Sequence, residues 1–154
     1  MSTQDLQWLL TRKTSSYIVK QKGLGRVFSR EPSNLTQIHS YKYSGLVNVK
    51  AVGVEAAPSG RGVVISTRKS KASPYAIKGS RSVQTIKKGG SRRAAGVVAS
   101  IVGKKGYRSD LTKAAVARAS AIVKSQQPGG RKQPPAKKVR GAAARKVVVE
   151  KTEA

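Results

Sequence analysis

The sequence contains no cysteine, and this absence excludes several classes of site together. Disulfides, thiolate zinc sites, iron–sulfur clusters and thiol nucleophiles all require cysteine side chains. Histidine is scarce as well, because His39 is the single one, and the sequence around it shows no partner nucleophile in a recognisable catalytic pattern. We therefore expect neither metal nor covalent chemistry and predict no cofactor.

Acidic residues are almost as scarce. The chain has 6 Asp and Glu residues against 32 Lys and Arg, which gives a formal charge of +26 over 154 residues. The few carboxylates are scattered along the sequence, whereas paired-carboxylate or metal-assisted hydrolysis needs carboxylates that lie close together. Uncompensated positive charge repels itself, and nucleic acid is the partner that most often neutralises it. The composition disfavours an enzyme with a small-molecule substrate and favours a nucleic-acid-binding protein.

Long hydrophobic runs are missing too. No apolar run approaches the roughly 20 residues that span a bilayer, and the first residues lack the basic-then-apolar order of a secretory signal. We therefore expect no membrane partner and a cytosolic or nuclear location. Apolar residues make up 38% of the chain, below the roughly 45–50% of ordinary globular proteins. One domain with a modest core, or a small domain with a tail, fits this length.

The fold class predicted from the pattern is α+β, and residues 1–68 are its β-rich part. A short helix is expected first, capped by Ser2 or Thr3, with Trp8 as a core anchor against the first hairpin. Residues 16–20 and 27–29 have the composition of that hairpin. The helix would present three leucines at helical spacing: Leu6, Leu9 and Leu10.

A second set of strands is predicted further on. Residues 38–50 are interpreted as an irregular strand interrupted at Gly45. Residues 49–54 and 62–67 flank a Pro-Ser-Gly-Arg turn and form the clearest hairpin of the sequence. The prediction is thus a small antiparallel sheet of hairpins.

The second half is expected to be helical after a basic loop at residues 69–90. A helix capped by Ser91 would carry an apolar stripe at i, i+3, i+4, i+7 and i+8, and a helix capped by Ser109 would run to about Ser125. These two amphipathic helices form a helical pair at residues 91–126. Residues 127–154 are rich in Pro, Gly and Lys and are predicted to be a basic extended tail, disordered or ordered by RNA.

Two patterns that carry nucleotide or sugar chemistry elsewhere have little support. Residues 23–28 lack the third glycine of a dinucleotide-binding loop, and no glycine-rich loop leads into a Walker-type Lys-Ser or Lys-Thr. The Asn-Leu-Thr triplet at 34–36 is interpreted as a plain turn, because no signal peptide precedes it.

Positively charged residues dominate the chain between Glu55 and Glu150. Between Glu55 and Glu150 there are 23 basic residues and one acid, Asp110. A solvated surface normally mixes both signs, so we expect contact with phosphates. The charges spread over loops, helix ends and tail instead of one recognition face, which favours structured RNA over sequence-specific DNA.

The helix beginning at Ser91 carries arginines in its first turn, at 92 and 93. Cations there oppose the helix dipole, whereas a phosphate on the free N–H groups would reverse that penalty. Tyr75 and Tyr107 lie in basic loops and are candidates for base stacking; Tyr41 and Tyr43 are expected more often in a core or at a strand edge. The predicted RNA contacts are Lys42, Arg68, Lys69, Lys71, Tyr75, Lys87, Lys88, Arg92, Arg93, Lys104, Lys105, Tyr107, Arg108, Arg118, Lys124, Arg131, Lys132, Lys137, Lys138 and Arg140.

An ordered series of short motifs resembles one family. The motifs include residues 5–8 (Asp-Leu-Gln-Trp), 31–35 (Glu-Pro-Ser-Asn-Leu), 40–46 (Ser-Tyr-Lys-Tyr-Ser-Gly-Leu), 60–64 (Gly-Arg-Gly-Val-Val) and 107–111 (Tyr-Arg-Ser-Asp-Leu). Over roughly residues 4–127 the chain resembles the eukaryotic cytosolic large-subunit ribosomal protein twenty-eight family. The stretch 69–90 follows the family only loosely, and the end after Gly129 finds no clear counterpart.

The resemblance implies a non-catalytic protein that binds large-subunit ribosomal RNA beside neighbouring ribosomal proteins. Its expected location is the cytoplasmic ribosome, with a nuclear or nucleolar assembly stage. A related ribosome-assembly factor is the closest alternative, but it carries cysteines and an acidic C-terminal region. A chromatin-associated protein is a second alternative, because the Lys-, Ala- and Pro-rich end resembles linker-histone tails.

Overall fold

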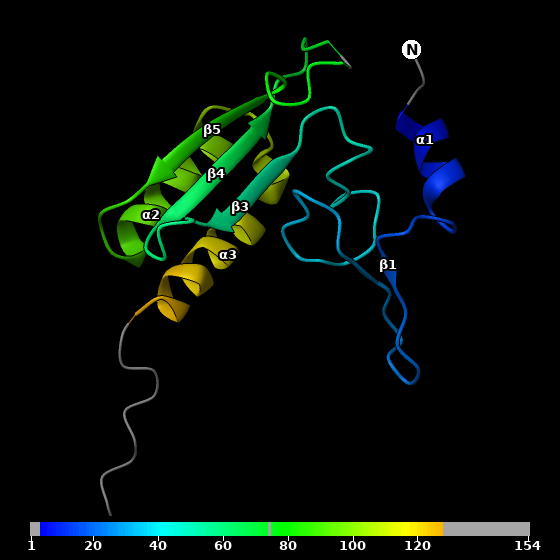
Figure 1. Cartoon of the computed structure of the whole chain (residues 1–154), viewed down its shortest axis with the longest axis horizontal. Helices are drawn as coiled ribbons and strands as arrows, with labels where there is room; N and C mark the ends of the chain where they lie inside the picture. Colours follow the sequence, from blue (N-terminus) through cyan, green and yellow to red (C-terminus); the bar gives the residue numbers. More distant parts are fainter. Residues whose placement is uncertain (1–3, 74, 128–154) are drawn as a thin grey trace, which may run out of the picture.

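The structure is a computed structural model that describes residues 4–73 and 75–127. It is an α+β fold, as predicted, with a short N-terminal helix, small antiparallel sheets and two further helices (Figure 1). The elements are α1 (Gln4–Thr11), β1 (Ile18–Val19), β2 (Phe28–Ser29), β3 (Val52–Ala56), β4 (Val63–Arg68), β5 (Arg81–Ile86), α2 (Ser91–Ala99), a π-helical turn (Ser100–Lys104), a 3-10 turn (Ser109–Leu111) and α3 (Thr112–Ser125).

The centre of the fold is a three-stranded antiparallel sheet in the order β3-β4-β5. Val54 pairs with Ile65, and Ile65 pairs with Gln84 on the other side. The predicted hairpin around the Pro-Ser-Gly-Arg turn is therefore confirmed. Because side chains alternate along a strand, one face presents Val52, Val54 and Ile65, all fully buried, to the helices.

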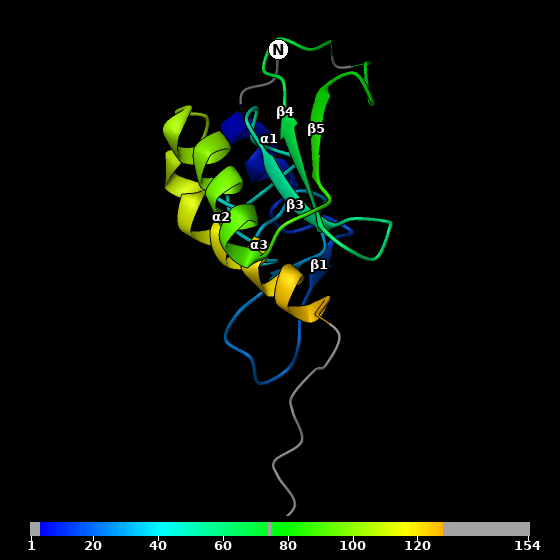
Figure 2. The same cartoon turned by 90° about the vertical axis from the view of Figure 1, so that its left-hand side faces the viewer.

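Helices α2 and α3 cover one face of the sheet, and no helix of the described residues lies on the other face, which we call the helix-free face (Figure 2). The predicted apolar stripe is confirmed, because Ala94, Val98 and Val102 are buried along α2 and the π-helical turn. Ala115 and Ala119 are the buried residues of α3. Small side chains at these contacts allow the helices to pack closely.

Two of the predicted helix caps, at Ser91 and Ser109, were wrong, and the predicted cap at Ser2 or Thr3 lies outside the described residues. Gly90 is the N-cap of α2, without a side-chain hydrogen bond, and Ser91 is already inside the helix. Arg108 precedes the 3-10 turn that starts at Ser109, again without a side-chain cap. In each case the capping residue lies one position earlier than expected, and no hydroxyl performs the capping.

The segment 69–90 was predicted to be a loop, but it contains β5. This strand carries few apolar residues: Val83 is 59% exposed and Ile86 is half-buried. It is held by backbone pairing with β4 over six residue pairs, from Val63–Ile86 to Arg68–Arg81. Sequence periodicity misses such an edge strand, because backbone pairing leaves no hydrophobic pattern.

The irregular strand predicted at residues 38–50 was also wrong. Ile38 makes one isolated bridge with Phe28, and the rest of the segment consists of turns. Side chains hold these turns: Asn48 Nδ2 donates to the carbonyl oxygens of Tyr41 and Ser44 at 2.8 and 2.7 Å. Such local side-chain bonds compete with strand pairing.

The first hairpin is confirmed, because β1 and β2 pair antiparallel. Each strand is only two residues long, and this hairpin is too small to bury the face of α1. Leu6, Leu9 and Leu10 are exposed, and Trp8 is half-buried. The Trp8 ring packs on His39 at 4.9 Å between centroids instead of entering the core, so the core-anchor prediction was wrong.

Candidate nucleic-acid interface

One end of the molecule collects five of the predicted contact residues. We name them the helix-start cluster: Lys87, Lys88, Arg92, Arg93 and Lys124. The first two follow β5, the next two lie in the first turn of α2, and the last lies in the final turn of α3.

The start of α2 lies beside the end of α3. Ser91 and Lys124 line the same surface groove, of about 450 Å³, between the start of α2 and the end of α3. Gln126 holds the β3–β4 turn beside this end of α3, since its amide donates to Gly62 O at 2.9 Å and its oxygen accepts from Gly62 N at 2.8 Å. A Cβ on Gly62 would lie 3.1 Å from Lys87 Cα, so this turn lies against the cluster, and its exposed Arg61 was absent from the sequence-based set. No sequence signal separates it from other turn residues.

The helix-start cluster has no carboxylate partner in the part of the chain that the structure describes, where the ion pair found is Arg108–Asp110. The first turn of α2 holds no acidic residue. Its free N–H groups and positive dipole end add to the charge of the two arginines. The cluster is thus a concentrated positive surface suited to phosphate groups.

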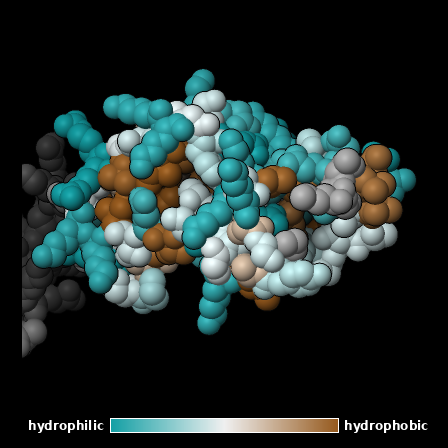
Figure 3. Space-filling view, turned by 90° about the horizontal axis from the view of Figure 1, so that it is seen from above, coloured by the Kyte–Doolittle hydropathy of each residue, from teal (hydrophilic) through white to brown (hydrophobic). Residues whose placement is uncertain are grey.

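Other predicted contacts are exposed at different places. Lys42 lies on the turns before β3, and Lys104 and Lys105 lie at the far end of α2. Lys69, Lys71 and Tyr75 lie in the connection between β4 and β5, where the Tyr75 side chain is 92% exposed. Seen from above, long hydrophilic side chains project in several directions around a smaller hydrophobic area (Figure 3).

Three of the arginines predicted to contact RNA donate hydrogen bonds to backbone carbonyl oxygens of the protein itself. Arg68 Nη1 donates to the carbonyl oxygens of Leu46 and Asn48 at 3.1 and 3.3 Å. Arg118 donates from Nε and Nη1 to two further carbonyl oxygens. These guanidinium groups brace loops against strands, a role that the number of charges does not reveal.

Arg108 is the third inward arginine. Its Nε and Nη2 each lie 2.8 Å from an oxygen of Asp110, while Nη1 and Nη2 also reach the carbonyl oxygens of Lys50 and Lys42. The hydrogen bonds with Arg108 lower the pKa of the Asp110 carboxyl, and the same contact raises the pKa of Arg108. This pair fastens the turns before β3 to the start of α3.

The tyrosines divide in a similar way. The Tyr107 hydroxyl donates to the carbonyl oxygen of Arg68, and its ring packs against the core. Burial raises the pKa of Tyr107. Tyr41 donates to Asp5 at 2.9 Å, and this bond raises its pKa. Tyr75 is the one of these three rings whose face is open to solvent.

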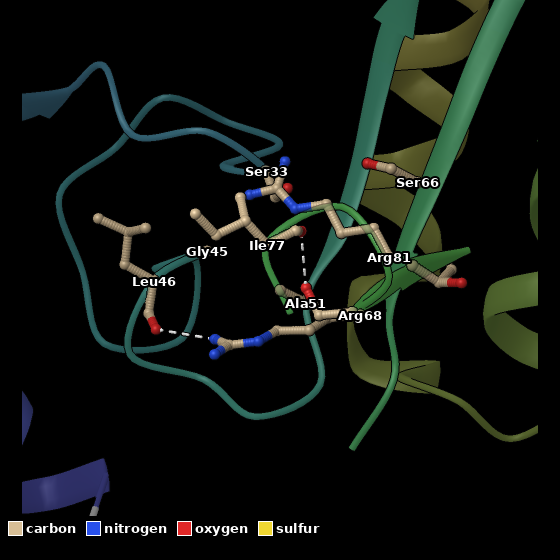
Figure 4. Close-up of a pocket in the computed structure, with 10 residues that line it drawn as sticks. Ser33, Gly45, Leu46, Ala51, Ser66, Arg68, Ile77 and Arg81 are labelled. Carbon is tan, nitrogen blue, oxygen red and sulfur yellow. Dashed lines mark hydrogen bonds between the residues drawn. The ribbon is translucent and has the colours of Figure 1, made fainter. Parts of the chain in front are cut away.

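A pocket that sequence reasoning missed lies on the helix-free face of the sheet (Figure 4). It has a volume of about 190 Å³ and is lined by residues of three segments, among them Ser33, Ser66 and Arg81. Arg81 belongs to β5, which was interpreted as loop, so no pattern could place it opposite Ser33.

Five predicted contacts fall outside the described residues: Arg131, Lys132, Lys137, Lys138 and Arg140. Within residues 4–73 and 75–127 the structure holds no group of three or more metal-binding side chains. None of the helices in that same portion combines the length and the apolar composition needed to cross a membrane.

Comparison with known proteins identifies the family. The model of the Ribosomal L28e protein family matches residues 6–125. The chain is 39% identical over 127 residues to the Large ribosomal subunit protein eL28 of Schizosaccharomyces pombe, covering 82% of this chain and 94% of that protein. The protein of the same name from Caenorhabditis elegans is 36% identical over 121 residues, covering 79% and 88%. The Dictyostelium discoideum protein is 31% identical over 116 residues, covering 75% and 83%. The chain belongs to the Ribosomal L28e protein family.

Proposed function

We propose that the protein is a structural constituent of the large subunit of the cytosolic ribosome, where it binds and braces ribosomal RNA. The observation that carries the proposal is the concentration of unpaired positive charge at the helix-start cluster in a chain whose relatives are named as large-subunit proteins. Catalysis is not part of this role. Its partners are ribosomal RNA and neighbouring ribosomal proteins, and it passes through a nuclear or nucleolar stage during assembly.

The proposed mechanism is electrostatic and geometric. The lysines and arginines of the helix-start cluster neutralise phosphates and release their counterions, so RNA affinity falls as salt rises. Beside the cluster, Gln126 holds the β3–β4 turn against the end of α3 through two hydrogen bonds with Gly62. A preorganised surface of this kind loses little conformational freedom when it binds.

Sedimentation of cell lysate tests the proposal. The chain should travel with the large subunit after magnesium chelation separates the subunits, and RNase, not DNase, should release it. Appearance only in free or small-subunit fractions would overturn the assignment. Release by DNase would favour the chromatin alternative, and presence in large-subunit precursors but absence from mature subunits would favour the assembly-factor alternative.

A further inference from the structure

The pocket on the helix-free face of the sheet has three walls. The turns before β3 supply Ser33 and Leu46, strands β4 and β5 supply Ser66 and Arg81, and the β4–β5 connection supplies Ile77. Figure 4 shows the Ser66 side chain pointing from β4 into the space, with Arg81 reaching toward Ser33 from the neighbouring strand. The hollow is therefore built jointly by segments that lie far apart in the sequence.

Two glycines let the walls of the pocket approach each other closely. A Cβ on Gly53 would lie 2.5 Å from Ser66 Oγ and 3.0 Å from Ser33 Oγ, so both hydroxyls converge over this residue. A Cβ on Gly45 would clash with the Pro32 carbonyl oxygen, so only glycine lets this turn lie so close to its neighbour. Both serines are half-buried and line the pocket, and neither hydroxyl makes a side-chain hydrogen bond within the described residues. The pocket thus offers two unused hydroxyls on its floor.

The charge of the pocket is positive. Arg81 is exposed and pairs with no carboxylate in the described part of the chain. Arg68 also lines the pocket, and its Nη1 donates to the carbonyl oxygens of Leu46 and Asn48. Glu31 lies behind the wall, but it is buried and accepts from Ser44 Oγ at 2.8 Å and Gly45 N at 3.2 Å. An anionic ligand therefore meets Arg81 first.

The rim of the pocket is apolar. Ile77 is 82% exposed and Leu46 is also exposed, although both are large hydrophobic residues beside a strongly basic surface. An unpaired nucleotide has a flat apolar base face, a polar base edge and a phosphate. These three parts match the apolar rim, the serine hydroxyls and Arg81, in that order. A peptide strand would dock on a free sheet edge, where backbone groups are available, whereas this pocket opens on a sheet face.

We propose that this hollow, which we name the Arg81 pocket, receives one unpaired nucleotide of RNA. The base packs against Ile77 and Leu46, its edge bonds to the hydroxyls of Ser33 and Ser66, and its phosphate pairs with Arg81. The inference rests on the proposed RNA-binding function and adds the recognition of an extruded base.

The test compares an RNA hairpin carrying a single bulged nucleotide with the same hairpin fully paired, with each of the four bases in the bulge. The full chain should bind the best bulged RNA about tenfold more tightly than the paired one, in line with base stacking by single-strand binders. Arg81→Ala should reduce this preference to near one. Lys78→Ala is the matched control, since it removes one charge from the neighbouring exposed connection without lining the pocket, and it should keep the preference.

A second pair of variants leaves the charge unchanged. Ser66→Val fills the floor and should abolish the bulge preference, whereas Thr85→Val changes a hydroxyl on the same sheet face outside the pocket and should retain it. Thermal unfolding checks that all variants fold. If Ser66→Val does not fold, the comparison of Arg81→Ala with Lys78→Ala alone tests the pocket.

Each outcome has one meaning. Equal affinity of the parent for bulged and paired RNA would overturn the Arg81 pocket while leaving the proposed function intact. Absence of binding to both RNAs would overturn the proposed function itself. A photo-crosslinking amino acid at Ile77, which lines the pocket, should join RNA in the assembled particle. A crosslink to protein alone would show that a protein segment occupies the pocket and would refute the nucleotide.

Discussion

Arg118 on α3 donates from Nε to the carbonyl oxygen of Val54 on β3 over 2.7 Å. Its Nη1 also donates to Leu35 O at 3.1 Å, so one half-buried side chain joins α3, the central sheet and the turns before β3. Hydrogen bonds from a charged donor to carbonyl oxygens are stronger than neutral ones. Arg118 thus stabilises the packing of α3 and the turns before β3 against the sheet.

Arg118→Ala should lower the free energy of unfolding by about 2 kcal/mol, because two carbonyl oxygens lose their donor. Urea unfolding measures this change. Lys113→Ala, at an exposed position of the same helix, is the control and should stay within about 0.5 kcal/mol of the parent. Equal stability of the two variants would contradict the bracing role.

The Arg108–Asp110 pair predicts a pH dependence. Contact with Arg108 lowers the pKa of Asp110 below its ordinary value of 3.8 in the folded protein, whereas the unfolded chain has the ordinary value. The stability from this pair is therefore fully present above about pH 4 and is lost as the pH falls through the lowered pKa.

Asp110→Asn should accordingly be less stable than the parent at neutral pH and equally stable in strong acid. The Asp110 side chain is 41% exposed, so solvent screening limits the difference to about 1 kcal/mol or less. Unfolding curves of both proteins across this pH range give the measurement. A difference that stays constant with pH would show that the ion pair is not its source.

The parts of the fold that could be predicted from the sequence are those held by periodic burial. The stripe through Ala94 and Val98 and the hairpin that pairs Val54 with Ile65 repeat their apolar residues at helical or strand spacing. The turns at residues 31–50 could not be predicted, because they depend on specific bonds such as Glu31 to Ser44, which have no period.

The candidate interface was predictable only in part, for a different reason. Composition gives the number of charged side chains, but not which of them are exposed and which bind groups inside the protein. Arg92 and Arg118 are indistinguishable by type, yet the first is exposed and the second binds carbonyl oxygens inside the fold. The Arg81 pocket needed the register of β5 against β4, which no sequence pattern indicated.

Trp8→Ala is expected to have a local effect. The ring packs on His39 and Tyr41 at 4.9 and 5.8 Å between centroids and does not join the main core. Removal of this aromatic packing should cost about 1–2 kcal/mol, less than removal of a core tryptophan. Amide hydrogen exchange should quicken in α1 and stay unchanged in β4. Loss of protection throughout β3 and β4 would restore the core-anchor interpretation.

Removal of the residues after Gln127 tests the contribution of the tail to RNA binding. The truncation takes away 8 basic and 2 acidic residues, a net charge of +6. RNA affinity should fall, and the slope of log affinity against log salt should become shallower by about 0.7–0.9 for each phosphate that the tail no longer neutralises. The unfolding midpoint should not change. An unchanged slope would show that these charges do not meet RNA.

The first turn of α2 carries two arginines. Arg92 and Arg93 are both exposed there, and a Cβ on Gly89 would lie 2.6 Å from Arg93 Cδ, so Arg93 lies close over the residues before the helix. Replacing both with Glu should stabilise the free protein by about 0.3–1 kcal/mol per site, because acidic side chains suit the positive end of the helix dipole.

The same double variant should bind RNA more weakly, since a phosphate at the helix-start cluster would meet two carboxylates in place of two guanidinium groups. The charge-matched control is Lys20→Glu with Lys22→Glu, at exposed positions of the first hairpin away from the cluster. Affinity for a structured RNA is measured for both at several salt concentrations. The cluster variant should lose more affinity than the control although its net charge is identical. Equal losses would mean that total charge, and not a phosphate seated on the start of α2, accounts for the binding.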